Sequence, residues 1–263
     1  MTSDRPSRHL FFAIAALLFA GGAGMTIVRS TSMSSMGSMP MPGGWTMSMT
    51  WMRMPEQTWL GAFASFVGMW IMMMVPMMLP SFIPTLWCYR QAVARVSKAR
   101  RGRLIMLAGS GYFVVWTAFG IGAFPIGVSL ATIEMQQPAL ARAVPLLAGV
   151  VILLAGFVQL TSFKSRQLVS CRDAHVWRLQ CPPMPNRAWR HGVRLGFQCA
   201  HCCANLMVIL LVIGVMDLRV MAAVTAAITA ERLLPSGERI ARVTGTVIAS
   251  TGLLLIARAA CLA

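Results

Sequence analysis

Apolar runs of about 20 residues recur along the chain, and they constrain its fold more than any other feature. A helix of that length crosses the hydrocarbon core of a bilayer. The runs stand at residues 10–28, 59–87, 104–128, 143–162, 197–216, 220–234 and 240–257. With 57% hydrophobic and 11% charged residues, the composition excludes an ordinary soluble enzyme and a disordered chain. We expect an all-α bundle of about seven transmembrane helices.

Two of these runs leave the number of spans open between six and seven. Run 220–234 is short and ends at Pro235-Ser236-Gly237, so it could pair with run 240–257 as a tight or tilted hairpin. The first run follows a short basic stretch and is either an uncleaved anchor or a signal segment. Three parts are therefore expected: an anchor or signal segment at 1–28, an extracytoplasmic methionine-rich loop at 29–58, and a helix bundle with basic inner loops at 59–263.

Basic residues fall mostly on one side of such a bundle when its N-terminus is placed inside. Eighteen of the 23 lysines and arginines then lie in inner segments, as the positive-inside rule requires. This pattern predicts a multi-pass membrane protein with its N-terminus on the inner side. It also assigns the net charge of +16 to loops that face anionic lipid head groups, so nucleic acid is not an expected partner.

The segment between the first two runs is rich in methionine, serine, glycine and proline, and its prolines and glycines argue against a regular helix. We expect no packed core there for methionine to fill. Thioether sulfur suits Cu(I) and is not lost to disulfides outside the cell. The candidate ligands are Met33, Met36, Met39 and Met41. The alternative is a loop adsorbed at head-group depth through its tryptophans.

Methionines also recur in the second run, where Met69, Met73 and Met77 stand four residues apart and share a helical face. Pro76 and Pro80 leave backbone carbonyl groups without their helical hydrogen bonds. Within the membrane this is tolerated where neighbouring groups or a cavity supply other partners. The stripe is either a path for a soft ion through the bundle or ordinary methionine packing.

Three thiols and a thioether share one helical face in the fifth run. They are Cys199, Cys202, Cys203 and Met207. On the inner side of the membrane these thiols stay reduced. The group predicts a site for Cu(I), or for zinc with His201 as a further ligand. The alternative is that the cysteines pack as small apolar residues.

Other polar residues give weaker indications of ligand chemistry. Cys171 and His175 are four residues apart and could bind one ion if that stretch is helical. Glu231 and Arg232 stand at an expected inner helix end, where snorkelling to the head groups accounts for them. Asp217 stands at an outer helix end and is kept as a further ligand candidate.

The chain lacks the sequence motifs of ATP-driven pumps, serine hydrolases, zinc proteases and dinucleotide-binding enzymes. It also has few acidic residues and no grouping of His, Asp and Ser that would supply acid–base catalysis. An enzymatic function is therefore disfavoured.

Three stretches together resemble the bacterial DUF2182 proteins, which are described as predicted metal-binding integral membrane proteins. The stretches are the methionine- and proline-rich 59–84, the pair Cys171-Arg172, and 196–221, which is similar to G-x-x-C-x-x-C-C-x-x-L-M followed by G-V-M-[ND]-L. Ala200-His201 departs from the usual Leu-Gly. The resemblance covers residues 59–242 and implies metal binding without naming a substrate.

The leading hypothesis is a membrane protein that binds a soft metal, Cu(I) before zinc, and takes part in its uptake, relay or delivery. A cuproprotein or a metal chaperone would then be its partner, beside the lipid bilayer. A second hypothesis is a membrane thiol–disulfide oxidoreductase that uses Cys199 and Cys202. A third is a structural or assembly subunit without bound metal.

Overall fold

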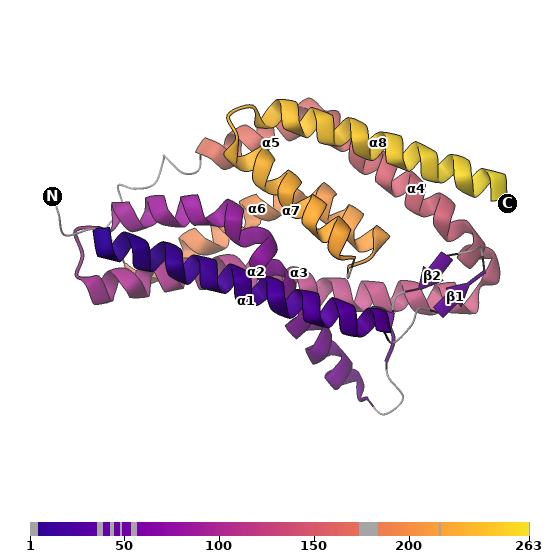
Figure 1. The fold of residues 1–263 in the computed structure, drawn as a ribbon, viewed down its shortest axis with the longest axis horizontal. Coiled ribbons are helices and arrows are strands. Elements are labelled where there is room, and N and C mark those ends of the chain that lie inside the picture. The colour runs from indigo at the N-terminus through magenta and orange to yellow at the C-terminus, as the bar shows by residue number, and fades with distance from the viewer. Residues whose placement is uncertain are drawn as a thin grey trace.

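The computed structural model describes residues 5–35, 39–42, 45–47, 49–53, 57–173, 184–215 and 217–262. This described part is a helix bundle with one short β-hairpin (Figure 1). Its helices are α1 (Arg5–Ser35), α2 (Trp59–Ala92), α3 (Lys98–Gln136), α4 (Pro138–Leu160), α5 (Ser162–Asp173), α6 (Pro185–Ile213), α7 (Leu218–Leu233) and α8 (Gly237–Leu262). The all-α fold class is confirmed.

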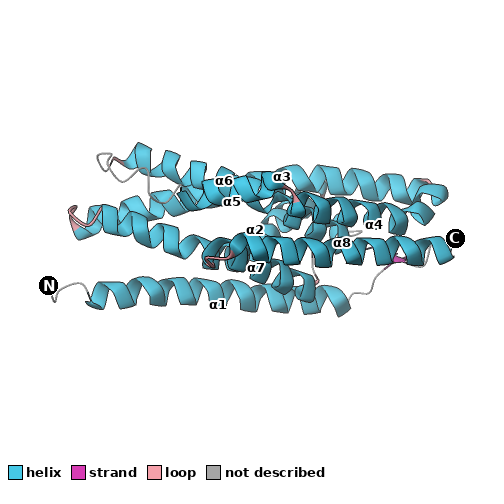
Figure 2. Cartoon of the chain, turned by 90° about the horizontal axis from the view of Figure 1, so that it is seen from above, coloured by secondary structure: helices cyan, strands magenta, loops and turns pink. Residues whose placement is uncertain are grey.

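Six of the described helices are long and apolar enough to cross a membrane, which makes the protein a multi-pass membrane protein. They are all the helices above except α5 and α7. The expected span at 220–234 corresponds to α7, whose 16 residues extend about 24 Å, less than the roughly 30 Å hydrocarbon core. Six of the described helices thus meet the length needed for a span, and the choice between the two expected counts depends on whether the shorter α7 also crosses. The N- and C-terminal ends of the chain lie at opposite ends of the bundle (Figures 1 and 2).

The basic segments of the chain gather at the end of the bundle that holds the N-terminus. The α2–α3 junction, α5, the start of α6 and the α7–α8 junction all lie there (Figure 1). This is the arrangement that the charge pattern requires, because all the segments assigned to the inner side meet at one end. The side of the membrane that this end faces stays a prediction.

Helices α3 and α6 approach each other closely because glycine stands at their contact. A Cβ built on Gly192 would lie 2.0 Å from the carbonyl oxygen of Ala108, so no larger residue fits without moving a backbone. Small residues allow this kind of approach between membrane helices. The contact brings the N-terminal half of α3 against the N-terminal half of α6, and the main buried core lies around these two helices, α2 and α7.

The methionine-rich segment folds as a hairpin of β1 (Met39–Met41) and β2 (Trp45–Met47), followed by a short 3₁₀ turn at Met49–Trp51. The expected absence of a regular α-helix is wrong for the first residues of this segment, because α1 continues to Ser35, whereas the described residues 39–42 and 45–47 form no α-helix. Trp45 donates its indole N–H to the carbonyl oxygen of Ala141 at 2.8 Å, which ties the hairpin to α4. Met47 is only 3% exposed. The expectation that these methionines have no core to fill is therefore wrong for Met47.

Candidate functional site

Cys199 lies midway along α6 and is fully buried in the bundle. Its Sγ atom is 3.8 Å from the Sγ atom of Cys203, one helical turn further along. It is also 3.9 Å from the Sδ atom of Met78, which comes from α2 and is likewise fully buried. Two thiols and one thioether therefore converge within the core, and we call them the sulfur site.

The spacing within the sulfur site matches what one soft metal ion requires. Sulfur ligands held about 2.3 Å from a common ion stand about 3.8 Å apart in a tetrahedral site and about 4.0 Å apart in a trigonal plane. The distances from Cys199 Sγ to Cys203 Sγ and to Met78 Sδ, 3.8 and 3.9 Å, lie within this range. Cys199 can therefore share one ion with Cys203 or with Met78 with little movement of either pair.

Two further side chains donate hydrogen bonds to the sulfur of Cys199. The Tyr112 hydroxyl on α3 donates at 3.0 Å, and an Arg232 guanidinium nitrogen on α7 donates at 2.9 Å. Tyr112 is fixed by stacking on Phe82, with ring centroids 4.0 Å apart. A permanent cation beside the sulfur offsets the negative charge that a thiolate ligand brings into a buried interior.

Cys202 does not join the sulfur site, although it lies between Cys199 and Cys203 in the sequence. Its thiol donates to the carbonyl oxygen of Gln167 on α5 at 3.3 Å. Cys171, also on α5, donates to the carbonyl oxygen of Gln198 at 3.4 Å. The neighbouring Cys202 thiol lowers the pKa of Cys171 below its ordinary value, and we call these two cysteines of the α5–α6 contact the Cys171–Cys202 pair.

A buried polar network lies next to the Cys171–Cys202 pair. Lys164 Nζ is 3.1 Å from a carboxylate oxygen of Glu231, with both side chains almost fully buried. The same ammonium group donates to the carbonyl oxygen of Cys202 at 2.5 Å. Gln159 donates to the other Glu231 oxygen and accepts from Asn205. Each charge in the network thus has a partner, as burial requires.

The residues proposed from the sequence are brought together only in part. Cys199 and Cys203 meet, whereas Met207 is buried elsewhere on α6 and His201 is exposed. Met69, Met73 and Met77 are buried along α2, and Met39 and Met41 lie in β1. Met36 and His175 fall outside the described residues, and the side chain of Met33 is not among those described.

Among the described residues, no group of three or more His, Cys, Asp or Glu side chains is arranged to hold a metal ion. The sulfur site has only two such members, and its third ligand is a methionine. The sequence-based ligand set thus stays a prediction, and the arrangement that the structure offers in its place is a mixed thiol and thioether site.

Two functional candidates of the sequence have a different role in the structure. Asp217 is the N-cap of α7, where its carboxylate accepts from the backbone N–H groups of Arg219 and Val220 at 2.8 and 3.2 Å. The snorkelling interpretation of Glu231 and Arg232 is wrong, because Glu231 is 1% exposed and Arg232 reaches the sulfur of Cys199.

Sequence reasoning missed Met78, Tyr112 and Arg232 as neighbours of Cys199, and Lys164 as the partner of Glu231. Some signals were present. Tyr112 is one of only two tyrosines in the chain, and it stands inside an apolar run. A polar group within such a run is a functional candidate by default, but nothing in the spacing shows which helix it faces.

One family model matches the chain, over residues 67–255, and it is described as "PpoB2: Copper chaperone". The match contains the whole sulfur site and leaves out α1 and the hairpin. No curated protein and no solved structure gives a significant match. The match agrees with the metal-related role implied by the DUF2182 resemblance, although it does not carry that family name.

Proposed function

This chain belongs to the PpoB2 copper chaperone family, and from that premise we propose that it binds Cu(I) as its cargo inside the membrane. The observation that carries the proposal is the convergence of Cys199, Cys203 and Met78. Soft thiolate and thioether ligands suit Cu(I), zinc and iron–sulfur clusters rather than hard ions. The sulfur site would hold the ion, and the protein would pass it on rather than keep it as a cofactor.

Copper fits this arrangement better than zinc does. Structural zinc sites are almost always tetrahedral and closed by four ligands. The sulfur site offers three sulfur atoms, and His201, the expected zinc ligand, points away from the core and is exposed. Arg232 beside Cys199 adds a positive charge, which opposes a divalent ion about twice as strongly as a monovalent one.

We infer a route that runs from the outer face of a bacterial inner membrane to its inner face. The methionine hairpin stands at one end, the methionines of α2 lead to Met78, and the Cys171–Cys202 pair lies beside Cys199 at the contact of α5 with α6. The basic loops would face the cytoplasm, as the charge bias predicts. A cuproprotein or a soluble metal chaperone would receive the ion.

The thiol–disulfide alternative has less support from the geometry. An exchange between Cys199 and Cys202 requires their sulfurs to meet, yet Cys199 faces α2 and α7 while Cys202 faces α5. The described cysteines are all free thiols. No observation favours this alternative over metal binding, so we do not propose it.

The test is the copper content of detergent-purified protein, measured by elemental mass spectrometry after reduction and loading with Cu(I). We expect about one copper at the sulfur site and its loss from C199S/C203S. Replacing Met78 with Leu keeps the volume and removes only the thioether, so M78L should weaken copper binding while the protein stays folded. The matched control is C261S, because Cys261 is an exposed thiol near the C-terminal end. Equal copper in wild type and C199S/C203S would overturn the proposal.

A further inference from the structure

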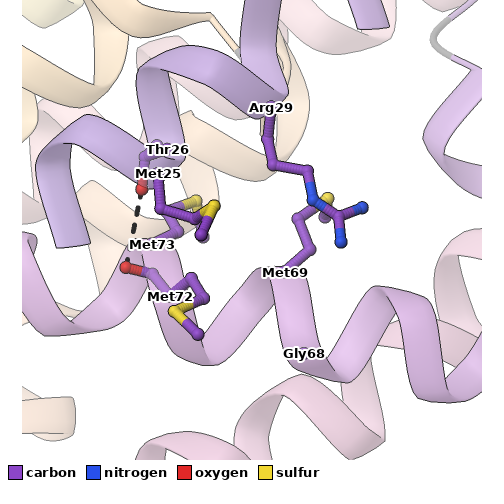
Figure 3. Close-up of a pocket in the computed structure, with 7 residues that line it drawn as sticks. All are labelled: Met25, Thr26, Arg29, Gly68, Met69, Met72 and Met73. Atoms are coloured by element: carbon purple, nitrogen blue, oxygen red, sulfur yellow. Dashed lines mark hydrogen bonds between the residues drawn. The ribbon is translucent and has the colours of Figure 1, made fainter. Parts of the chain in front are cut away.

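A cavity of about 150 Å³ lies between α1 and α2, separate from the sulfur site. Its lining includes four methionines, together with Thr26, Arg29 and Gly68 (Figure 3). The methionines are Met25 from α1 and Met69, Met72 and Met73 from α2. Met25 lies outside the residues that match the copper chaperone family, so the α1 side of this cavity is a feature of the chain beyond that match.

The backbone that shapes the cavity is held by a proline and a glycine. Pro76 has no N–H group, so the carbonyl of Met72, four residues earlier, lacks its usual helical hydrogen bond. The Thr26 hydroxyl lies 3.5 Å from this carbonyl oxygen and 2.8 Å from the carbonyl oxygen of Gly22 (Figure 3). A Cβ on Gly22 would lie 2.9 Å from the Pro76 ring, so glycine is needed for α1 to approach.

The side chains around the cavity differ in exposure, so the cavity has an open side and a closed side. Met25 and Met72 are 48% and 47% exposed, whereas Met69 and Met73 are 8% and 1% exposed. Two thioethers thus stand at the mouth and two at the floor. A soft ion that reaches the mouth could exchange its ligands one at a time on its way inward.

The chemistry of the lining selects the ion. Four neutral thioethers offer soft ligands, and no carboxylate or imidazole stands among the described residues that line the cavity. Hard ions such as Mg²⁺ and Ca²⁺ require oxygen ligands. The Arg29 guanidinium adds a fixed positive charge, which disfavours divalent ions more than monovalent ones. The remaining class is a soft monovalent cation.

We propose that this cavity is the uptake site for Cu(I), at which the ion lies between α1 and α2 before it reaches the sulfur site. The proposal rests on the proposed function, and it names the position and ligands of the first intramembrane site. Met25 and Met72 capture the ion, and Met69 and Met73 carry it to the floor.

The α2 helix connects this cavity to the sulfur site. Met73 and Met77 are one turn apart, which is about 6 Å along the axis, and Met78 lies one residue further. Met73, Met77 and Met78 are each no more than 2% exposed. An ion at Met73 therefore has buried thioethers at each step until it meets Cys199.

The experiment uses Ag(I), a soft monovalent ion, on the full chain purified in detergent. In the C199S/C203S background, M25L/M72L is compared with the control M106L/M135L, which replaces two exposed methionines of α3. Ag(I) content is measured by elemental mass spectrometry, and thermal unfolding confirms that each variant is folded. We expect M25L/M72L to bind about one Ag(I) fewer than the control. Equal binding would overturn the proposal.

Oxidation of methionine by peroxide gives a second readout with residue resolution. A thioether bound to a metal ion is blocked from becoming the sulfoxide. Ag(I) should protect Met25 and Met72 and leave Met106, which is 74% exposed, reactive. Unprotected Met25 and Met72 under saturating Ag(I) would also refute the uptake site. A failure of the sulfur site itself would be detected separately, because wild type and C199S/C203S would then bind equal amounts of copper.

Discussion

The buried pair of Lys164 and Glu231 gives the sharpest test of how the core is held together. The two charged atoms are 3.1 Å apart and the side chains are 1% and 2% exposed, so water does not screen them. Removing one member leaves the other charge buried without its ion partner, which costs about 3–5 kcal/mol. At about 2.1 cal/mol/K of unfolding entropy per residue, a chain of this length should lose about 5–9 °C in Tm.

The variants are K164M, which keeps most of the side-chain volume, E231L, and the two combined. The combined variant removes both charges, so it should cost clearly less than the two single changes added together. Part of the cost remains, because the carbonyl oxygen of Cys202 and the amide of Gln159 each lose a partner. Thermal unfolding in detergent, followed by loss of monodisperse protein, measures all three.

The control is E238Q, which changes an exposed glutamate in the first turn of α8. It should cost no more than about 1 kcal/mol, since only a helix-dipole interaction is weakened. The reasoning is refuted if K164M is as stable as wild type, or if the combined variant loses the full sum of the two single variants.

Three further outcomes are expected. G192A should lose about 1–3 kcal/mol of stability, because its methyl group overpacks the α3–α6 contact. G102A should gain up to about 1 kcal/mol from helix propensity, because a Cβ at that position meets open space. Equal unfolding temperatures for the two variants would contradict this packing. Y112F removes one donor to the sulfur of Cys199 and should weaken Cu(I) binding by about 0.5–1.5 kcal/mol, measured by competition with a Cu(I) chelator; unchanged affinity would mean that the hydroxyl does not act on the bound site. D217A removes the α7 N-cap and should cost about 0.5–2 kcal/mol of stability, without changing copper stoichiometry.

The helices of this fold are readily predicted because a membrane span is a local property of the sequence. About 20 apolar residues in succession identify it, and neither partners nor register are needed. The short α7 shows where prediction from apolar run length fails. Its apolar run is too short to settle whether the helix crosses the membrane. The caps and the packing that end the helix cannot be deduced from composition.

The candidate site was harder to predict because its contacts are remote in the sequence. Helical spacing places Cys199 and Cys203 on one face, and the structure confirms that they meet. The same spacing also included Cys202 and Met207, since a pattern of i, i+3 and i+4 cannot tell which neighbour a face meets. Met78 and Tyr112 stand 121 and 87 residues before Cys199, so only tertiary packing brings them there.

Three prolines of α2 stand at four-residue intervals, at Pro76, Pro80 and Pro84. Each removes one main-chain hydrogen bond, and because residues four apart stack, the missing bonds fall along one side of the helix. A helix that lacks main-chain hydrogen bonds along one side bends most easily in a single plane. Met78 lies within that stretch, so flexing of α2 changes the gap between its thioether and the thiols of α6. If the proposed sulfur site holds an ion, bending of α2 would provide a way to release it.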